Sequence, residues 1–306
     1  MKPARRAVSG VLLLNKPAGI SSTAAVGWAK RLFNAAKAGH TGTLDPFATG
    51  LLLVCFGEAT KYSRFHLAAD KRYRATLKLG ARSTTGDTEG EPIDPKDVTC
   101  SLSDIHAALA AMTGRQCQMP PMHSAVKVAG VPLYKLARKG QTADRPKREI
   151  EVYALTVVEW RSPELVIDAH VSKGTYMRVL AEDIGESLGC GAYLVALQRT
   201  GSGDLGLDRA TTFDTLESLA PEQRDATLLP TPTLALSLPA VSLPAKDAQA
   251  FSHGRPVPGP AHPAGTLVRV VDPQGCFLGV ATMLQDGDQF RLVPERLMNV
   301  MSFESN

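Results

Sequence analysis

Long hydrophobic runs, paired cysteines and clustered histidines are all missing from this sequence of 306 residues. The longest apolar run, near residues 51–56, is far shorter than the roughly 20 residues that cross a bilayer and is typical of a buried strand. The five widely spaced cysteines form no C-x-x-C pair. They argue against a disulfide framework and indicate a reducing cytoplasm. The seven histidines form no H-E-x-x-H motif, so we expect no metal. The short apolar runs predict no membrane partner.

Charge of both signs is present but unevenly distributed. The formal net charge is +4, yet residues 1–80 hold 13 basic and three acidic residues, and the remaining residues carry a net charge of −6. A second basic run at 127–148 has seven basic residues and one acidic residue. Such clusters on a nearly neutral chain are typical of a phosphate-rich partner such as nucleic acid, although solvated surface lysines and arginines would have the same composition.

The length and the pattern of apolar residues predict about two domains. A proline-punctuated segment at 228–245 leads to the predicted boundary, which separates residues 1–240 from a small β-rich module at 241–306. Within that module, residues 266–282 are predicted to form a hairpin. The periodicity predicts strands at 10–17, 51–57, 73–79, 150–158, 164–171 and 290–293, and helices at 22–34, 102–113 and 177–188.

Two short motifs match the residue patterns of functional signatures but lack the secondary structure that those signatures require. Residues 201–206 match G-x-G-x-x-G, but no helical stripe follows them, as a dinucleotide site would require. Residues 185–189 match G-x-S-x-G, but the preceding residues have helical periodicity, which makes Ser187 an ordinary helix-end residue. No Walker-type lysine follows the glycine-rich loop at 39–50. We therefore expect no cofactor.

The loop GHTGTLDPFATG at 39–50 is the most informative segment. It contains two ionisable side chains, His40 and Asp45, and Asp45 is the only acidic residue among the first 57. Asp45 followed by Pro46 would also suit the start of a helix, with the carboxylate as N-cap. A lone carboxylate in the most basic part of the chain instead favours a nucleophile or base that acts on RNA or DNA.

Five ordered sequence blocks resemble those of the TruB-type tRNA pseudouridine synthases. Residues 39–61 resemble the signature segment of that family at almost every position. The other four blocks resemble its N-terminal K-P-x-G block, its active-site tyrosine strand, its Q-x-P-P block and its G-T-Y block. These four lie at 10–22, 71–80, 118–140 and 172–200.

This resemblance implies an α+β fold with a mixed, mainly antiparallel β-sheet and flanking helices. An RNA-binding insert would occupy about 115–150, and the C-terminal module would be similar to the PUA-type RNA-binding domain. The implied activity is isomerisation of uridine-55 in the tRNA T-loop to pseudouridine, without a cofactor. The implied partner is tRNA, bound through its T-arm by a cytoplasmic monomer that requires no protein partner.

Position by position, the resemblance assigns the catalytic roles to Asp45, Tyr73 and Arg178. Asp45 would be the nucleophile, and Arg178 would pair with it, lower its pKa and keep it charged. Tyr73 would stack on the uracil and help to remove the C5 proton. Further substrate contacts are implied for a histidine that wedges into the T-loop, a tyrosine near the carboxylate and a leucine that lines the base pocket. These are His40, Tyr176 and Leu197.

The sequence departs from the family pattern in three places. His123 stands where tyrosine is usual, Gln198 replaces a usual arginine, and residues 83–87 are a loosened version of T-D-T-G-D. We expect none of these to touch the catalytic side chains. Two alternatives stay open: an RNA-binding protein that kept the scaffold without catalysis, and a pseudouridine synthase with another, guide-dependent target. The intact catalytic set argues against the first, and the basic insert favours stand-alone tRNA binding over the second.

Overall fold

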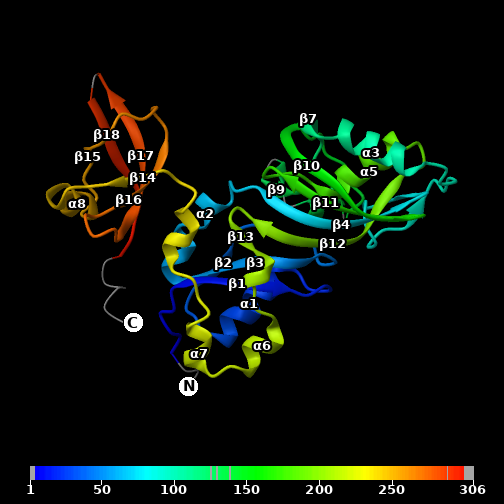
Figure 1. Ribbon diagram of the computed structural model, residues 1–306. Coiled ribbons are helices and arrows are strands. Elements are labelled where there is room, and N and C mark those ends of the chain that lie inside the picture. The colour runs from blue at the N-terminus through cyan, green and yellow to red at the C-terminus, as the bar shows by residue number, and fades with distance from the viewer. Residues whose placement is uncertain (1–3, 125, 129, 138, 288, 300–306) are drawn as a thin grey trace.

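The strands of the protein form two main β-sheets, nine-stranded and five-stranded, in the N-terminal and C-terminal parts of the chain (Figure 1). No helix in the described part of the chain is both long and apolar enough to cross a membrane. Arg138, which belongs to the predicted basic run, lies outside the described residues. The computed structural model describes residues 4–124, 126–128, 130–137, 139–287 and 289–299.

The nine-stranded sheet is mixed but mainly antiparallel, which confirms the expected fold class. Its strands run in the order β1-β3-β12-β4-β11-β10-β7, with β2 beside β3 and β13 beside β12, and β3 and β12 are parallel. The strands span Gly10–Lys16 (β1), Ala38–His40 (β2), Thr49–Phe56 (β3), Lys71–Leu79 (β4), Gly114–Gln118 (β7), Arg148–Arg161 (β10), Glu164–Val171 (β11), Ala192–Ser202 (β12) and Leu205–Gly206 (β13).

Three helices pack into one hydrophobic cluster with the strands of this sheet. They are α1 (Ser22–Leu32), α3 (Leu102–Ala111) and α5 (Met177–Ser187), as the periodicity predicted. In α5 the buried residues include Leu180 and Ile184, which lie four positions apart on one face of the helix. This packing fixes the N-terminal end of α5, where the predicted catalytic arginine is located.

The segment that follows β13 packs back along α1 before it reaches the second sheet. Trp28 of α1 stacks on Phe213 with ring centroids 3.8 Å apart, and its indole N–H donates to Glu217 at 2.9 Å. The shorter elements of the chain are η1 (Gly57–Lys61), α2 (Ser63–His66), β5 (Arg82–Ser83), β6 (Pro92–Ile93), η2 (Leu207–Arg209), α6 (Phe213–Ser218), α7 (Pro221–Asp225) and η3 (Thr231–Ala235).

The five-stranded sheet has the order β14-β16-β17-β18-β15. The predicted hairpin is confirmed, because the Gly275 N–H donates to the Asp272 carbonyl at 3.0 Å across the turn. The Asp272 carboxylate also accepts from the backbone N–H groups of Gln274 and Cys276. The elements are β14 (Ala240–Ser242), α8 (Ala245–Ser252), β15 (Val257–Pro258), β16 (Leu267–Val271), β17 (Phe277–Asp286) and β18 (Gln289–Leu297).

A second hydrophobic cluster joins the two sheets. It contains Leu13 and Leu53 from β1 and β3 and Phe277 and Val280 from β17. The ring of Tyr62 stands edge-on to that of Phe277, with centroids 5.3 Å apart. The C-terminal sheet is therefore held against the face of β1 and β3 that carries Leu13 and Leu53, by apolar contacts as well as by the connecting chain.

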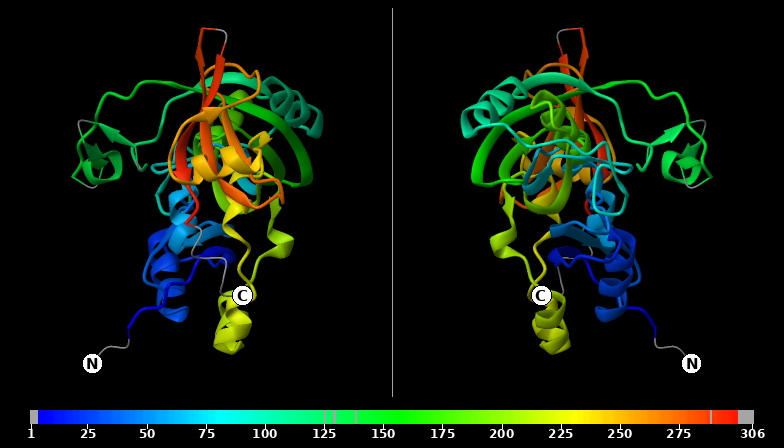
Figure 2. Two further views of the ribbon diagram at one scale, coloured as in Figure 1. Left: turned by 90° about the vertical axis from the view of Figure 1, so that its left-hand side faces the viewer. Right: turned by 90° about the vertical axis from the view of Figure 1, so that its right-hand side faces the viewer.

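The segment between β7 and β10 leaves the large sheet and returns to it. It contains β8 (Lys127–Val128), β9 (Val131–Pro132) and the short helix α4 (Leu133–Ala137). Figure 2 shows it reaching away from both sheets. The Arg145 guanidinium donates to the Pro120 carbonyl at 3.1 Å and so joins the outgoing and returning ends.

The G-x-G-x-x-G and G-x-S-x-G matches lie in the structural contexts that the sequence predicted. The alternative role of Asp45 as a helix N-cap is wrong. Residues 201–206 form the β12–β13 hairpin instead of opening a helix, and Ser187 is the last residue of α5. The N-cap interpretation of Asp45 fails, because no helix begins at Pro46 within the described stretch 4–124. Instead, the Ala48 N–H closes a turn on the Asp45 carbonyl at 3.1 Å.

Candidate active site

The loop that contains Asp45 joins β2 to β3, and two side chains from the N-terminal segment hold its middle. The Ser22 hydroxyl, at the start of α1, donates to the Leu44 carbonyl at 2.9 Å and accepts from the Leu44 N–H at 2.8 Å. The ammonium of Lys16, at the end of β1, donates to the Pro46 carbonyl at 3.3 Å. The residues on both sides of Asp45 are therefore fixed.

Arg199 of β12 fixes the two ends of the same loop. Its buried guanidinium donates to the carbonyls of Gly42, Thr43 and Leu51 at 3.2, 3.4 and 2.7 Å. The backbone of Gly50 packs closely against that of Arg199, so that a Cβ at Gly50 would lie 2.4 Å from the Arg199 carbonyl oxygen. The φ of Gly50 is +99°. Only glycine fits that position, so the glycine-rich sequence is needed for close packing of the loop on β12.

Arg178, the second residue of α5, brings three segments together. Its Nε lies 3.1 Å from Asp45 Oδ2 and 3.4 Å from Asp87 Oδ2. Its Nη1 donates to the Thr85 carbonyl at 3.2 Å and its Nη2 to the His123 carbonyl at 2.8 Å. One guanidinium therefore connects the loop of Asp45, the loop of Asp87 and the base of the insert.

Two of the departures from the family pattern thus contact a catalytic side chain, and our expectation that none would do so is wrong. The segment 83–87 supplies both Thr85 and Asp87 to Arg178, and His123 supplies its carbonyl. The expectation rested on the identities of the side chains, whereas the Thr85 and His123 contacts use backbone carbonyl oxygens. The His123 contact is therefore available to any residue at that position.

The two carboxylates on Arg178 differ in their access to solvent. The Asp45 side chain is 36% exposed, whereas that of Asp87 is 1% exposed. Asp87 also accepts a hydrogen bond from the Thr85 hydroxyl at 2.6 Å and from the Glu89 N–H at 3.0 Å. Asp87 therefore holds Arg178 from within the protein, and Asp45 is the carboxylate that a substrate can reach.

Burial raises the pKa of Asp45 above its ordinary value. The charge of Arg178 and its hydrogen bond lower the pKa, as expected, but Asp87 raises it and the effect of burial is the largest. The predicted effect of Arg178 is therefore present, but burial outweighs it and the net shift of the pKa is upward. A higher pKa makes the ionised carboxylate a stronger base and nucleophile.

Tyr73 and Leu197 lie on the neighbouring strands β4 and β12. Leu197 pairs with Ala75 in the antiparallel register, and side chains two residues apart on a strand share a face. Tyr73 and Leu197 therefore point to the same side of the sheet, where both contact the cluster that includes α5. The structure brings these predicted residues to the face on which α5 carries Arg178.

Tyr176 precedes α5 and is fixed through its backbone. Its N–H donates to Gln118 Oε1 at 2.7 Å, and Gln118 Nε2 donates to its carbonyl at 3.1 Å. Because α5 begins at the next residue, the buried Gln118 amide fixes the start of the helix that carries Arg178. The contact of the Tyr176 hydroxyl near Asp45 stays a prediction.

His40 lies on β2, where the loop of Asp45 begins. Its Nδ1 accepts a hydrogen bond from the Gly42 N–H at 3.2 Å, so the ring turns back onto its own loop. Burial and the charge of Arg199 lower the pKa of His40, which favours the neutral ring. The contact of His40 with a T-loop stays a prediction.

Besides Ser22, four buried polar side chains that position the site were not singled out from the sequence. Burial lowers the pKa of one of them, Lys16, to about 8. Each lies in a segment that resembles the family pattern, and this location was the only sequence signal that could have pointed to a role at the site. All four are at most 4% exposed, and they are Lys16, Asp87, Gln118 and Arg199.

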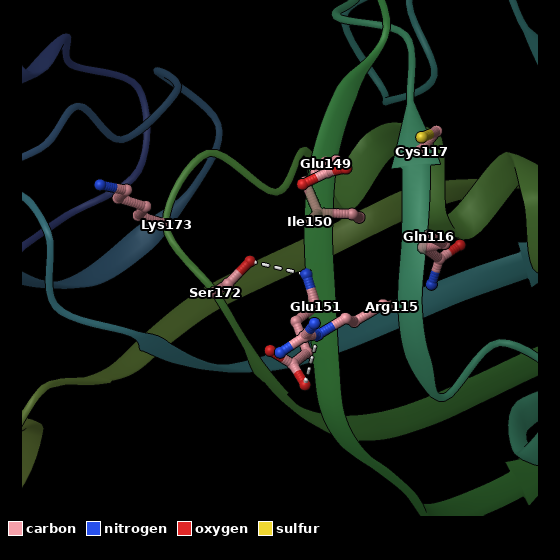
Figure 3. A pocket seen from close by; sticks show the side chains of 8 residues that line it. All are labelled: Arg115, Gln116, Cys117, Glu149, Ile150, Glu151, Ser172 and Lys173. Carbon is pink, nitrogen blue, oxygen red and sulfur yellow. Dashed lines mark hydrogen bonds and ion pairs between the residues drawn. The ribbon is translucent and has the colours of Figure 1, made fainter.

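No metal-binding cluster accompanies this site: nowhere in the described part of the chain do three His, Cys, Asp or Glu side chains lie so that they could hold a metal ion. A hollow on the surface lies elsewhere, between β7, β10 and the loop after β11 (Figure 3). It is lined in part by Arg115 and Glu151, which lie 3.8 Å apart, and includes none of the predicted site residues.

Three segments of the chain match described protein families. Residues 30–177 match the TruB family pseudouridylate synthase N-terminal domain. Residues 178–236 match the tRNA pseudouridylate synthase B C-terminal domain, and residues 239–298 match the pseudouridine synthase II TruB C-terminal family. Together these segments cover most of the chain.

Similar proteins match over nearly the whole length. The tRNA pseudouridine synthase B of Thiobacillus denitrificans is 51% identical over 298 residues, which are 97% of this chain and 98% of that protein. The Burkholderia mallei protein of the same name is 49% identical, over 96% of this chain and 98% of its own. A chain in a solved Cbf5–Nop10–Gar1 complex has a TM-score of 0.74 at 26% identity, covering 95% of this chain and 84% of its own. The chain therefore belongs to the TruB family of pseudouridylate synthases.

Proposed function

We propose that this protein isomerises uridine-55 in the T-loop of tRNA to pseudouridine, with Asp45 as the nucleophile. The observation that carries the role of Asp45 is the difference in access between the two carboxylates on Arg178, which are 36% and 1% exposed. Membership of the TruB family and similarity to proteins named tRNA pseudouridine synthase B support the reaction and the substrate.

The chemistry of pseudouridine formation suits a single activated carboxylate. The N1–C1′ bond of uridine breaks, the uracil turns, and C5 bonds to C1′, so no electrons and no group pass to another molecule. The Asp45 carboxylate attacks the nucleotide or takes a proton from its ribose. The ion pair with Arg178 engages Oδ2 and leaves Oδ1 for the substrate. Because burial raises the Asp45 pKa, the ionised oxygen is more reactive than that of an exposed aspartate.

A stacked uridine reaches Asp45 only after it leaves the loop of the RNA. Flipping costs a few kcal/mol, which stacking on an aromatic ring and contacts with the base edge offset. The half-buried ring of Tyr73 on β4 supplies the stacking surface, and Leu197 on β12 supplies an apolar wall on the same face. In this proposal, Tyr73 also helps to remove the C5 proton.

The remaining parts of the proposal concern the grip on the T-arm. His40 wedges into the T-loop, Tyr176 contacts the base near the carboxylate, and the basic insert at about 115–150 binds the backbone. Residues 1–240 are the catalytic domain, and residues 241–306 are a PUA-like domain that adds RNA contacts. The protein acts as a monomer and needs no protein partner.

Mapping pseudouridine in tRNA from cells with and without this protein tests the proposal. Position 55 should lose its pseudouridine when the protein is absent and regain it when the gene is restored. Unchanged T-loop modification would overturn the substrate assignment. The purified protein should also convert an unmodified T-arm stem-loop without a guide RNA. Failure to do so, with activity restored by a guide, would identify a guide-dependent enzyme instead.

A further inference from the structure

Strand β4 carries a buried positive charge next to Tyr73 and on the same face. Lys71 precedes Tyr73 by two residues, so the two side chains point to the same side of the sheet, with their Cα atoms about 7 Å apart. Lys71 is 7% exposed, and its ammonium donates to the carbonyls of Ala69 at 2.5 Å and Leu67 at 3.4 Å. This charge is therefore fixed beside the surface on which the target base would stack.

The surroundings of Lys71 are positive. Burial lowers the pKa of Lys71 to about 8, and the charges of Arg199 and Lys173 lower it as well, against an opposing contribution from Asp70. The Asp70 carboxylate is itself bonded to the ring of His170. Because a buried cation is costly unless an anion balances it, an anionic ligand at this place would relieve the excess of positive charge.

The loop that carries Lys173 begins beside Lys71, because Val171, the last residue of β11, pairs with Lys71 of β4. The backbone N–H of Ser172 donates to the Glu151 carbonyl at 2.8 Å, and its hydroxyl accepts from the Glu151 N–H at 2.8 Å. The Thr175 hydroxyl donates to the Ser172 carbonyl at 3.0 Å. The loop is thus held on both sides of an exposed lysine, whose side chain points away from β7 and β10 (Figure 3).

No carboxylate in the described part of the chain forms an ion pair with Lys173. We propose that Lys173 binds a backbone phosphate of the RNA next to the target nucleotide, with the buried charge of Lys71 reinforcing the attraction. This inference rests on the proposed function, because it takes the substrate to be RNA. Tyr73 pairs with Ala169 of β11, four residues before Lys173, so a base stacked on Tyr73 would have its own phosphates near this loop. A lysine on a fixed loop loses little freedom when it binds a phosphate.

The first test measures binding of a T-arm stem-loop RNA to the Asp45→Asn protein, which the proposed function predicts to leave its ligand unconverted. Adding Lys173→Gln should weaken binding about 5–10-fold at about 0.1 M salt and make the plot of log K against log salt shallower by about 1. Lys173→Arg should retain most of the affinity. The control is Lys78→Gln, because Lys78 is exposed on the opposite face of β4 and its loss should leave both quantities unchanged.

The second test locates the phosphate. A neutral methylphosphonate replaces one linkage at a time around the target nucleotide. At one linkage this replacement should weaken binding about as much as Lys173→Gln does. The Lys173→Gln protein should bind RNA with that replaced linkage no more weakly than it binds unmodified RNA. Additive losses at every linkage, or an unchanged salt slope in Lys173→Gln, would overturn the proposal.

The phosphate site and the proposed function can fail separately. If the wild-type chain does not convert T-arm RNA but Lys173→Gln still reduces the salt slope, the function is wrong and the phosphate site stands. If the RNA is converted and the slope is unchanged, the function stands and Lys173 is a solvated surface residue.

Discussion

The Nε atom of Arg178 lies 3.1 Å from Oδ2 of Asp45, and this ion pair joins the start of a helix to the middle of a glycine-rich loop. Asp87 lies 3.4 Å from the same nitrogen and competes for it. Asp87, which a substrate cannot reach, therefore positions Arg178. The same guanidinium also pairs with Asp45, which a substrate can reach. The predictions below follow from this shared arginine and from the residues that hold it.

The dependence of activity on pH should report the ionisation of Asp45. The reaction requires the charged carboxylate, so log kcat/KM should fall with decreasing pH through a pKa above the ordinary aspartate value. Asp87→Asn removes a negative charge that raises this pKa, and the acid limb should move to lower pH. Asp168→Asn is the control, because Asp168 pairs with Arg74 on the other face of the sheet. An acid limb that moves to higher pH in Asp87→Asn would contradict the assignment.

Arg178→Lys should reduce single-turnover conversion about 100-fold or more, although the charge is kept. An ammonium cannot reproduce the planar set of donors with which Arg178 meets Asp45, Asp87 and two carbonyls. Binding of T-arm RNA, measured separately, should change less than about threefold. A lysine variant that kept more than a tenth of the rate would show that the geometry of the guanidinium is unimportant.

Gln118→Ala should destabilise the protein by about 1–3 kcal/mol, because two hydrogen bonds to the Tyr176 backbone are lost from a buried site. Conversion should slow as well, since the start of α5 loosens. The matched control is Gln116→Ala on the same strand, where the amide only donates to the Met112 carbonyl. Urea unfolding and single-turnover rates check both effects, and equal losses in the two variants would count against a special role for Gln118.

Tyr62→Phe should stabilise the protein or leave it unchanged. The Tyr62 hydroxyl is buried without a hydrogen-bond partner among the described residues, so its removal relieves a desolvation cost of about 1 kcal/mol. Tyr62→Leu, by contrast, loses the ring contact with Phe277 between the sheets and should destabilise by about 1–3 kcal/mol. Thermal unfolding distinguishes the two, and a clear loss of stability in Tyr62→Phe would reveal a partner for the hydroxyl.

Local periodicity predicted several elements around the site, but not β12, which carries Leu197 and Arg199, or β2, which carries His40. The stripe of α5, the apolar run of β3 and the turn at Asp272 are properties of neighbouring residues, and each is found where it was predicted. The basic surroundings of Asp45 favoured it before any resemblance was considered, and the roles of the other five site residues came from the resemblance to the family. The structure brings Arg178 to Asp45 and places Tyr73 and Leu197 on one face.

The buried polar contacts could not be predicted, because each depends on a partner that is distant in the sequence. Lys16 reads as an ordinary strand-end lysine until its ammonium is seen to hold the Asp45 loop. The net direction of the Asp45 pKa shift could not be predicted for the same reason. The sequence indicates a basic neighbourhood, but the depth of burial that outweighs it is a property of the folded chain.

The central claim is that the Asp45 carboxylate performs the reaction. Asp45→Asn keeps the shape and one oxygen that can accept from Arg178, but it removes the nucleophilic charge. The decisive measurement is pseudouridine formation in a T-arm stem-loop under single-turnover conditions, with the affinity for the same RNA determined in parallel. Asp45→Asn should form no detectable pseudouridine while its Kd stays within about threefold of the wild-type value. Wild-type conversion by Asp45→Asn would contradict the account.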